Sequence, residues 1–164
     1  MKMRVMYLCL FGCLAMVGCT HAVRPHSQQV TDASRSIVEG EVAAVIHSYM
    51  AGYTAARCDD VTPVSKLVRD RMMYVTASKV VWVPLAETEQ ETRDMVCGWV
   101  SHSGTVDSVT VDVLSPDVAV AGWLYHDEVK LKSGEIKRYK GSALMTLVRS
   151  GDGWKIAATM AANE

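Results

Sequence analysis

LSPDVAVAGWLYHDEVKLKSGEIKRYKGSALMTLVRSGDGWKIAATM, residues 114–160, contains three apolar runs with the composition of β-strands, at 118–129, 139–149 and 154–160. Lys-Ser-Gly-Glu and Ser-Gly-Asp-Gly separate them. Both are turn sequences, because glycine takes positive φ freely and serine and aspartate bond their own backbone. Three strands joined by two such turns predict an antiparallel meander.

The residues before this stretch predict more strands. Thr105–Leu114 alternates, with Val109, Val111 and Val113 on one face, so it should be a strand that leads into the meander. Residues 71–83 are rich in Val, Met, Tyr and Trp and predict one or two strands, with a bend at 77–79.

Three helices are expected among these strands. The first should run from Ser36, which forms a capping-box pattern with Glu39, to about Arg57. Apolar residues repeat along it at three- and four-residue spacing. A short helix from Thr62 to about Val68 and a third from residue 85 to about 100 follow. Helices segregated from a run of strands indicate an α+β fold, with the helices on one face of a curved sheet.

The first residues have the pattern of a secretory signal peptide. Lys2 and Arg4 precede an uncharged apolar run at 5–17. Met16-Val17-Gly18-Cys19 then resembles the lipobox of bacterial lipoproteins, which implies cleavage before Cys19 and attachment of lipid to it. Lipidation at Cys13, or an ordinary signal peptide, is the alternative. We expect a signal peptide at 1–18, a flexible tether at 19–35 and one domain at 36–164.

Composition excludes several classes of function. Without the signal peptide the chain has 15 basic and 18 acidic residues, a net charge of −3, and no concentrated basic face for nucleic acid. Cys58 and Cys97 are the cysteines left in the domain, and they lack zinc-ligand spacing. They could form a disulfide or remain separate buried thiols. No metal or other cofactor is predicted.

A family resemblance over residues 37–161 depends on the segments Tyr53–Asp60, Ser115–Val120, Lys132–Gly134 and, most specifically, Gly151–Ile156. In these segments the chain resembles the nuclear transport factor 2-like superfamily, also called cystatin-like or cone-shaped, and especially its SnoaL-like bacterial branch. The resemblance implies a bent sheet that wraps the first helix around an apolar cavity. Such proteins include ketosteroid isomerases, polyketide cyclases, dehydratases and docking domains, and many are dimers through the sheet.

The same resemblance speaks against catalysis. The position of the acidic donor in ketosteroid isomerases falls near Met145, and that of the base falls within residues 74–82, which hold no carboxylate or histidine. Histidines that often follow the Trp-Lys-Ile motif are replaced by residues 157–160, Ala-Ala-Thr-Met. A pair such as Tyr49 with His102, which we expect near the cavity rim, would be needed for proton transfer.

Aromatic side chains are the candidate ligand-binding residues of the cavity. Tyr and Trp combine a large apolar face with one polar group, which suits a mostly hydrophobic ligand. Alternatively these side chains fill the cone. The charges of residues 127–140 indicate an exposed hairpin face or the rim of a dimer sheet. Tyr49 is the preferred donor. The predicted set is Tyr49, Tyr53, Trp82, Trp99, Trp123 and Tyr125.

The sequence thus predicts a lipoprotein of the bacterial cell envelope, anchored by lipid to a membrane and facing the periplasm or exterior. Its domain should bind a small apolar ligand or a protein partner without catalysis, and could be a homodimer through the sheet. One alternative is an isomerase, dehydratase or cyclase acting on a small hydrophobic substrate. The other is a structural or docking protein with a filled cone.

Overall fold

The computed structural model describes residues 31–76 and 78–163, so the predictions for the signal peptide, Cys19 and most of the tether lie outside the described residues. Three helices and six strands form an α+β fold, as predicted. In chain order they are α1 Asp32–Ala55, α2 Thr62–Ser65, β1 Val68–Val75, β2 Val80–Pro84, α3 Leu85–Cys97, β3 Trp99–Ser115, β4 Val118–Leu131, β5 Ile136–Ser150 and β6 Gly153–Asn163.

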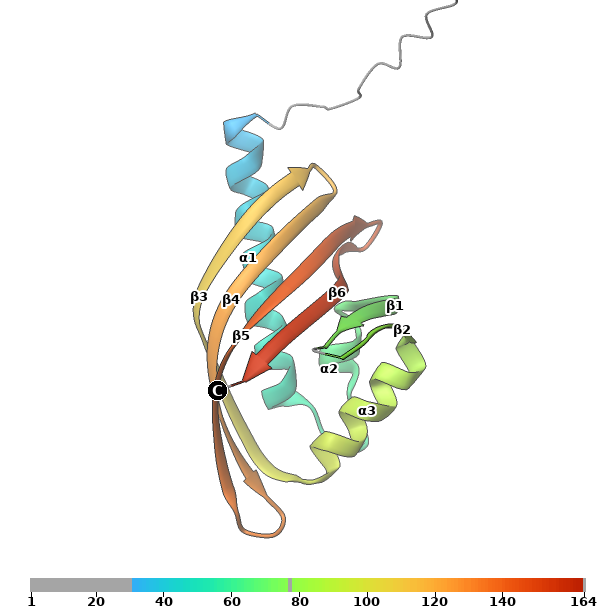
Figure 1. Cartoon of the computed structure of the whole chain (residues 1–164), viewed down its shortest axis with the longest axis vertical. Helices are drawn as coiled ribbons and strands as arrows, with labels where there is room; N and C mark the ends of the chain where they lie inside the picture. The colour runs from blue at the N-terminus through green and yellow to red at the C-terminus, as the bar shows by residue number, and fades with distance from the viewer. Residues whose placement is uncertain (1–30, 77, 164) are drawn as a thin grey trace, which may run out of the picture.

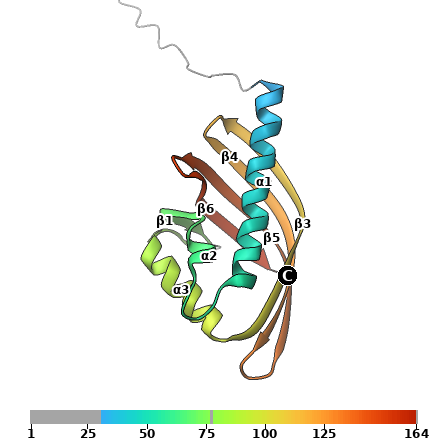
Figure 2. The same ribbon diagram turned by 180° about the vertical axis from the view of Figure 1, so that it is seen from behind.

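The six strands form one curved sheet in the order β2-β1-β6-β5-β4-β3. Strands β3 to β6 are the antiparallel meander that the sequence predicts. β1 pairs in parallel with β6, which makes the sheet mixed. All helices lie on one side of the sheet (Figure 1). Seen from behind, α1 runs along the inner face of β3 to β5, while α3 lies at the end near β1 (Figure 2).

Helix boundaries differ from the predicted ones. α1 begins at Asp32 with Thr31 as its N-cap, whose side chain accepts a hydrogen bond from the backbone N–H of Ser34. Ser36 therefore lies inside the helix, and the predicted capping box is wrong. α3 ends at Cys97 rather than near residue 100, because β3 begins at Trp99, which pairs with Leu131 at the end of the long strand β4.

The core lies between α1 and the inner face of the sheet. Val42 and Ile46 of α1 are fully buried in one cluster with Ala119 and Ala121 of β4. Further along the same face of β4, the side chains of Trp123, Tyr125 and Asp127 are larger or polar, and they line a cavity.

A cluster of polar side chains connects α1 to β5 and β6 through hydrogen bonds. Glu41 accepts hydrogen bonds from the indole N–H of Trp154, at 2.9 Å, and from Arg149, whose guanidinium also lies 4.7 Å from the centre of the Trp154 ring. The hydrogen bonds from Trp154 and Arg149 lower the pKa of Glu41 below its ordinary value of 4.5.

Glu41→Gln should lower the free energy of unfolding by about 0.5–1 kcal/mol at pH 7, since charged hydrogen bonds stabilise but these are partly exposed. The pKa of Glu41 is lower in the folded protein than in the unfolded chain. This stabilisation is therefore present above pH 4.5 and is lost as the pH falls through the pKa of the folded protein. Urea unfolding of wild type and variant should show a larger difference at pH 7 than at pH 3. Glu39→Gln, on the same helix, is the control, and an equal loss there would contradict the assignment.

The face of the sheet away from the helices exposes the apolar side chains of Leu124, Leu144 and Met160. Homodimer formation through this face stays a prediction. Among the described residues, no helix is both long and apolar enough to cross a membrane.

Candidate functional site

A cavity of about 470 Å³ opens between α1, α3 and the inner face of the sheet. Its wall includes five of the six aromatic residues that the sequence predicts. Two further tyrosines, Tyr74 of β1 and Tyr139 of β5, also line it and were not predicted. The five predicted residues are Tyr49, Tyr53, Trp99, Trp123 and Tyr125.

The prediction that Trp82 lines the cavity is wrong. Trp82 lies on β2 with 57% of its surface exposed, and the guanidinium of Arg71 covers its ring at 4.8 Å from the centroid. Side chains alternate along a strand, and Val83 faces the core. Trp82 therefore points to the opposite face, away from the cavity.

The tyrosines are neutral hydrogen-bonding groups. Tyr49 and Tyr53 lie one helical turn apart on α1, with their hydroxyl oxygens 3.0 Å apart and their rings edge to face. Burial raises the pKa of Tyr49 well above its ordinary value, and also that of Tyr53. For Tyr74, burial raises the pKa to about 12. These hydroxyls thus keep their protons at neutral pH and can donate to a ligand.

His102 lies in the wall of the cavity rather than at its rim, with its side chain 4% exposed. Its ring stacks on Trp99 with the centroids 4.9 Å apart, and Nδ1 lies 3.1 Å from the hydroxyl of Thr54 on α1. Nε2 lies 3.7 Å from Oδ1 of Asp127. The predicted pair of Tyr49 and His102 shares the cavity, but the acidic group beside His102 is Asp127.

Asp127 corrects the prediction that residues 127–140 form only an exposed hairpin face. Its side chain is 19% exposed and lines the cavity, as do Lys137 and Tyr139. The strand alternation that puts Trp123 and Tyr125 on one face continues to Asp127, and this signal was present in the sequence.

Gly104 makes room for the pair of His102 and Asp127. It is the residue opposite Asp127 in the pairing of β3 with β4. A Cβ atom there would lie 2.6 Å from Oδ1 of Asp127 and 3.0 Å from Cε1 of His102, and would also meet Sδ of Met50. The glycine therefore allows close packing, since a Cβ atom here would force neighbouring side chains to shift.

Two buried polar atoms in this region have no hydrogen-bond partner among the described residues. They are Nε1 of Trp123, a donor, and Oδ1 of Asp127, an acceptor. Buried polar groups are nearly always paired in folded proteins, so such exceptions call for an explanation.

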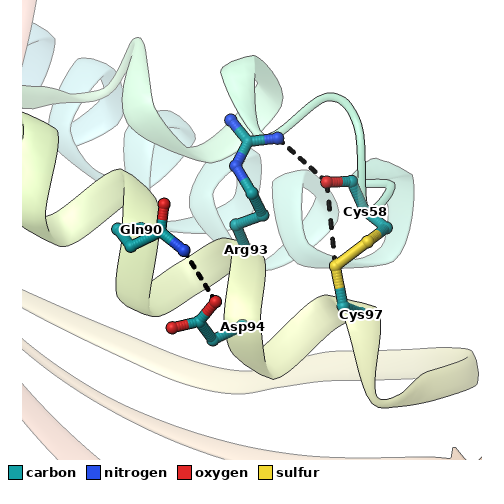
Figure 3. Close-up of a disulfide and its surroundings, with 5 residues drawn as sticks. All are labelled: Cys58, Gln90, Arg93, Asp94 and Cys97. Carbon is teal, nitrogen blue, oxygen red and sulfur yellow. Dashed lines mark hydrogen bonds between the residues drawn. A yellow bond between two sulfur atoms is a disulfide. The ribbon is translucent and has the colours of Figure 1, made fainter.

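Cys58 and Cys97 are joined by a disulfide, with their Cα atoms 4.5 Å apart. Figure 3 shows that the bond links the segment after α1 to the end of α3, and that Arg93 donates to the carbonyl of Cys58, at 2.9 Å. Trp99 follows Cys97 by two residues, so the disulfide holds the start of β3 and with it one wall of the cavity.

Comparison with known structures finds the same arrangement of helices and sheet. A nuclear transport factor 2-like superfamily protein from Salmonella enterica serovar Typhimurium LT2 superimposes with a TM-score of 0.67 at 14% identity, covering 79% of this chain and 92% of that one. The chain has the nuclear transport factor 2-like fold. No protein-family model matches the sequence, and no curated protein matches it.

Two solved enzymes or candidate enzymes share the nuclear transport factor 2-like fold with this chain. A candidate scytalone dehydratase from Novosphingobium aromaticivorans DSM 12444 has a TM-score of 0.72 at 8% identity, covering 82% of this chain and 89% of that one. Hexachlorocyclohexane dehydrochlorinase LinA-type3 from Novosphingobium barchaimii LL02 has a TM-score of 0.67 at 9% identity, covering 82% and 91%. At these identities the likeness concerns the fold.

The resemblance implies certain positions for catalytic acids and bases. The residues that line the cavity at those positions carry no titratable group other than a tyrosine. Met145 and Thr159 line the wall from these positions, and Tyr74 is the contribution of β1. The titratable pair of His102 and Asp127 comes instead from β3 and β4. Across residues 31–76 and 78–163, no cluster of three or more His, Cys, Asp or Glu side chains could hold a metal ion.

Proposed function

We propose that the domain binds a small, largely apolar organic molecule in its cavity. The observation that supports this most is the cavity volume of about 470 Å³, which the described side chains leave unfilled and which lies in the range of small-molecule sites. A structural or docking role with a filled cone does not account for that space.

The polar atoms of the wall indicate that the ligand also carries a polar group. A buried donor or acceptor without a partner costs about 1–3 kcal/mol. The indole N–H of Trp123 and Oδ1 of Asp127 are such groups among the described residues. A ligand that reaches them would gain hydrogen bonds that the free protein lacks.

Intrinsic fluorescence tests the proposal, because Trp99 and Trp123 line the cavity and Trp82 does not. Titration with 2-phenylethanol should give a saturable change in emission. Trp82→Phe should retain the amplitude, whereas Trp123→Phe should reduce it and weaken binding about 3- to 10-fold, as expected for one lost hydrogen bond. An unchanged spectrum up to the solubility limit would contradict binding.

A second candidate function is acid–base catalysis on the bound molecule, and the placement of His102 favours it. Imidazole is the commonest general base, and here Thr54 and Trp99 hold the ring beside Asp127. Two structural neighbours are described as a dehydratase and a dehydrochlorinase, names that denote elimination reactions. His102 would remove a proton from carbon, and a tyrosine hydroxyl would donate to the oxygen that gains charge.

Exchange of the α-hydrogens of cyclohexanone in D₂O, followed by NMR, tests this candidate without knowledge of the substrate. His102→Gln should slow the protein-dependent exchange about 100-fold, the lower range for general-base catalysis. His126→Gln is a matched control, because His126 forms a surface pair with Asp107 at 2.7 Å. Exchange no faster than in buffer would contradict catalysis and leave ligand binding as the proposed function.

We also propose that a lipid on Cys19 anchors the domain to a membrane of the bacterial envelope, on the lipobox-like sequence at 16–19. Cys19→Ser expressed in a bacterial host should abolish incorporation of labelled palmitate and release the protein from the membrane fraction. Cys13→Ser should leave both unchanged. Continued labelling of the Cys19→Ser variant would refute this site.

A further inference from the structure

We propose that the cavity selects a small organic cation, an apolar molecule that carries a protonated or methylated amine. This inference rests on the proposed binding function and names its ligand class. It depends on one juxtaposition. Asp127 has a buried carboxylate oxygen without a hydrogen-bond partner among the described residues, and it lines the same cavity as the aromatic rings.

The nearest positive candidate does not engage this carboxylate closely. Nε2 of His102 is 3.7 Å from Oδ1 of Asp127, beyond hydrogen-bond distance. In the exposed pair of His126 and Asp107, by comparison, Nδ1 lies 2.7 Å from Oδ1. His102 is instead within hydrogen-bond distance of Thr54, at 3.1 Å. Oδ1 of Asp127 therefore receives no hydrogen bond from His102 and can accept one from a bound cation.

Lys137 also lines the cavity, on the strand that follows the β4–β5 turn. Its side chain is 43% exposed, and its ammonium lies 3.9 Å from the carboxylate of Glu135. A solvated ammonium that already pairs with Glu135 does little to neutralise Asp127. Because Glu135 partly neutralises Lys137, this lysine repels a bound cation less than an unpaired lysine would.

The aromatic wall is suited to a cation. Ring faces carry negative electrostatic potential, and attraction of a cation strengthens when the site is desolvated. The rings contact one another around the cavity, with Trp123 and Tyr125 centroids 4.9 Å apart and Tyr53 and Trp99 centroids 6.3 Å apart. Burial, and next the negative charge of Asp127, raise the pKa of Tyr125. The field of the carboxylate thus reaches a neighbouring ring.

Three probes of one shape and different charge test the inference by calorimetry at pH 7: 2-phenylethylammonium, 2-phenylethanol and phenylacetate. The ammonium compound should bind at least about 10-fold more tightly than the alcohol, and phenylacetate should be weakest. Asp127→Asn should bring the ammonium compound to the level of the alcohol, while Asp107→Asn should leave the order unchanged.

The outcomes separate the two proposals. Alcohol binding that equals or exceeds ammonium binding in the wild-type protein would overturn the cation preference and leave the cavity as a site for neutral ligands. Absence of binding by all three probes would overturn the binding function itself. The wild-type comparison stands even if Asp127→Asn fails to fold, which circular dichroism would reveal.

Discussion

Gly104→Ala should abolish binding in the cavity and lower the free energy of unfolding by about 1–3 kcal/mol, the usual cost of overpacking. The added methyl would lie 2.6 Å from Oδ1 of Asp127 and 3.0 Å from Cε1 of His102, so the two side chains would have to separate. Met50, which also lines the cavity, would have to move as well. Urea unfolding and the phenylethanol titration measure the two effects.

Gly40→Ala is the matched control, because a Cβ atom at this exposed position of α1 meets no atom within 4 Å. Alanine in a helix interior is better than glycine by about 0.5–1 kcal/mol, so this variant should be more stable and bind normally. A Gly104→Ala protein that binds as tightly as wild type would show that the pair of His102 and Asp127 does not form the ligand site.

Loss of the disulfide should have the largest effect on stability. Cys58 and Cys97 are separated by 39 residues in sequence. Closing a loop of this length stabilises a fold by about 3–4 kcal/mol, mainly through the unfolded chain. The Cys58→Ser, Cys97→Ser double variant should therefore unfold at a temperature roughly 10–20 °C lower.

Reducing agent provides the control for this prediction. Dithiothreitol should destabilise the wild-type protein by the same amount and leave the double variant unaffected. Because the bond holds the start of β3, binding should weaken in both reduced and double-variant proteins. Equal melting temperatures with and without the reductant would contradict a structural role.

The sequence predicted the meander and the helical face of the fold because these follow from local patterns. Alternation predicted part of β3, apolar runs predicted β4 to β6, and glycine-containing turns separated these later strands. Pairing of β1 with β6 could not be predicted in this way, since it joins residues about 85 positions apart, such as Tyr74 and Thr159. The helix start at Asp32 was missed because Thr31 offers the same capping chemistry as Ser36.

The candidate site shows a similar division. Tyr49 and Tyr53 were predicted on the first helix and Trp99 on the third. The structure places all three on the cavity wall, with Trp99 at the start of β3 rather than in a helix. Asp127 was assigned to an exposed hairpin because neighbouring residues are charged, although strand alternation put it on the face of Trp123. The approach of His102 to Asp127 depends on the missing side chain of Gly104, a tertiary fact that a single sequence does not contain.

Methionine methyl groups offer the most direct test of the cavity as a binding site. Met50, Met95 and Met145 line it, whereas Met160 lies on the exposed face of the sheet. In a protein labelled with [¹³C]methyl-methionine, 2-phenylethylammonium should shift the signals of the first three residues in a saturable way and leave Met160 unchanged. Shifts confined to Met160, or the absence of any saturable shift, would contradict the account.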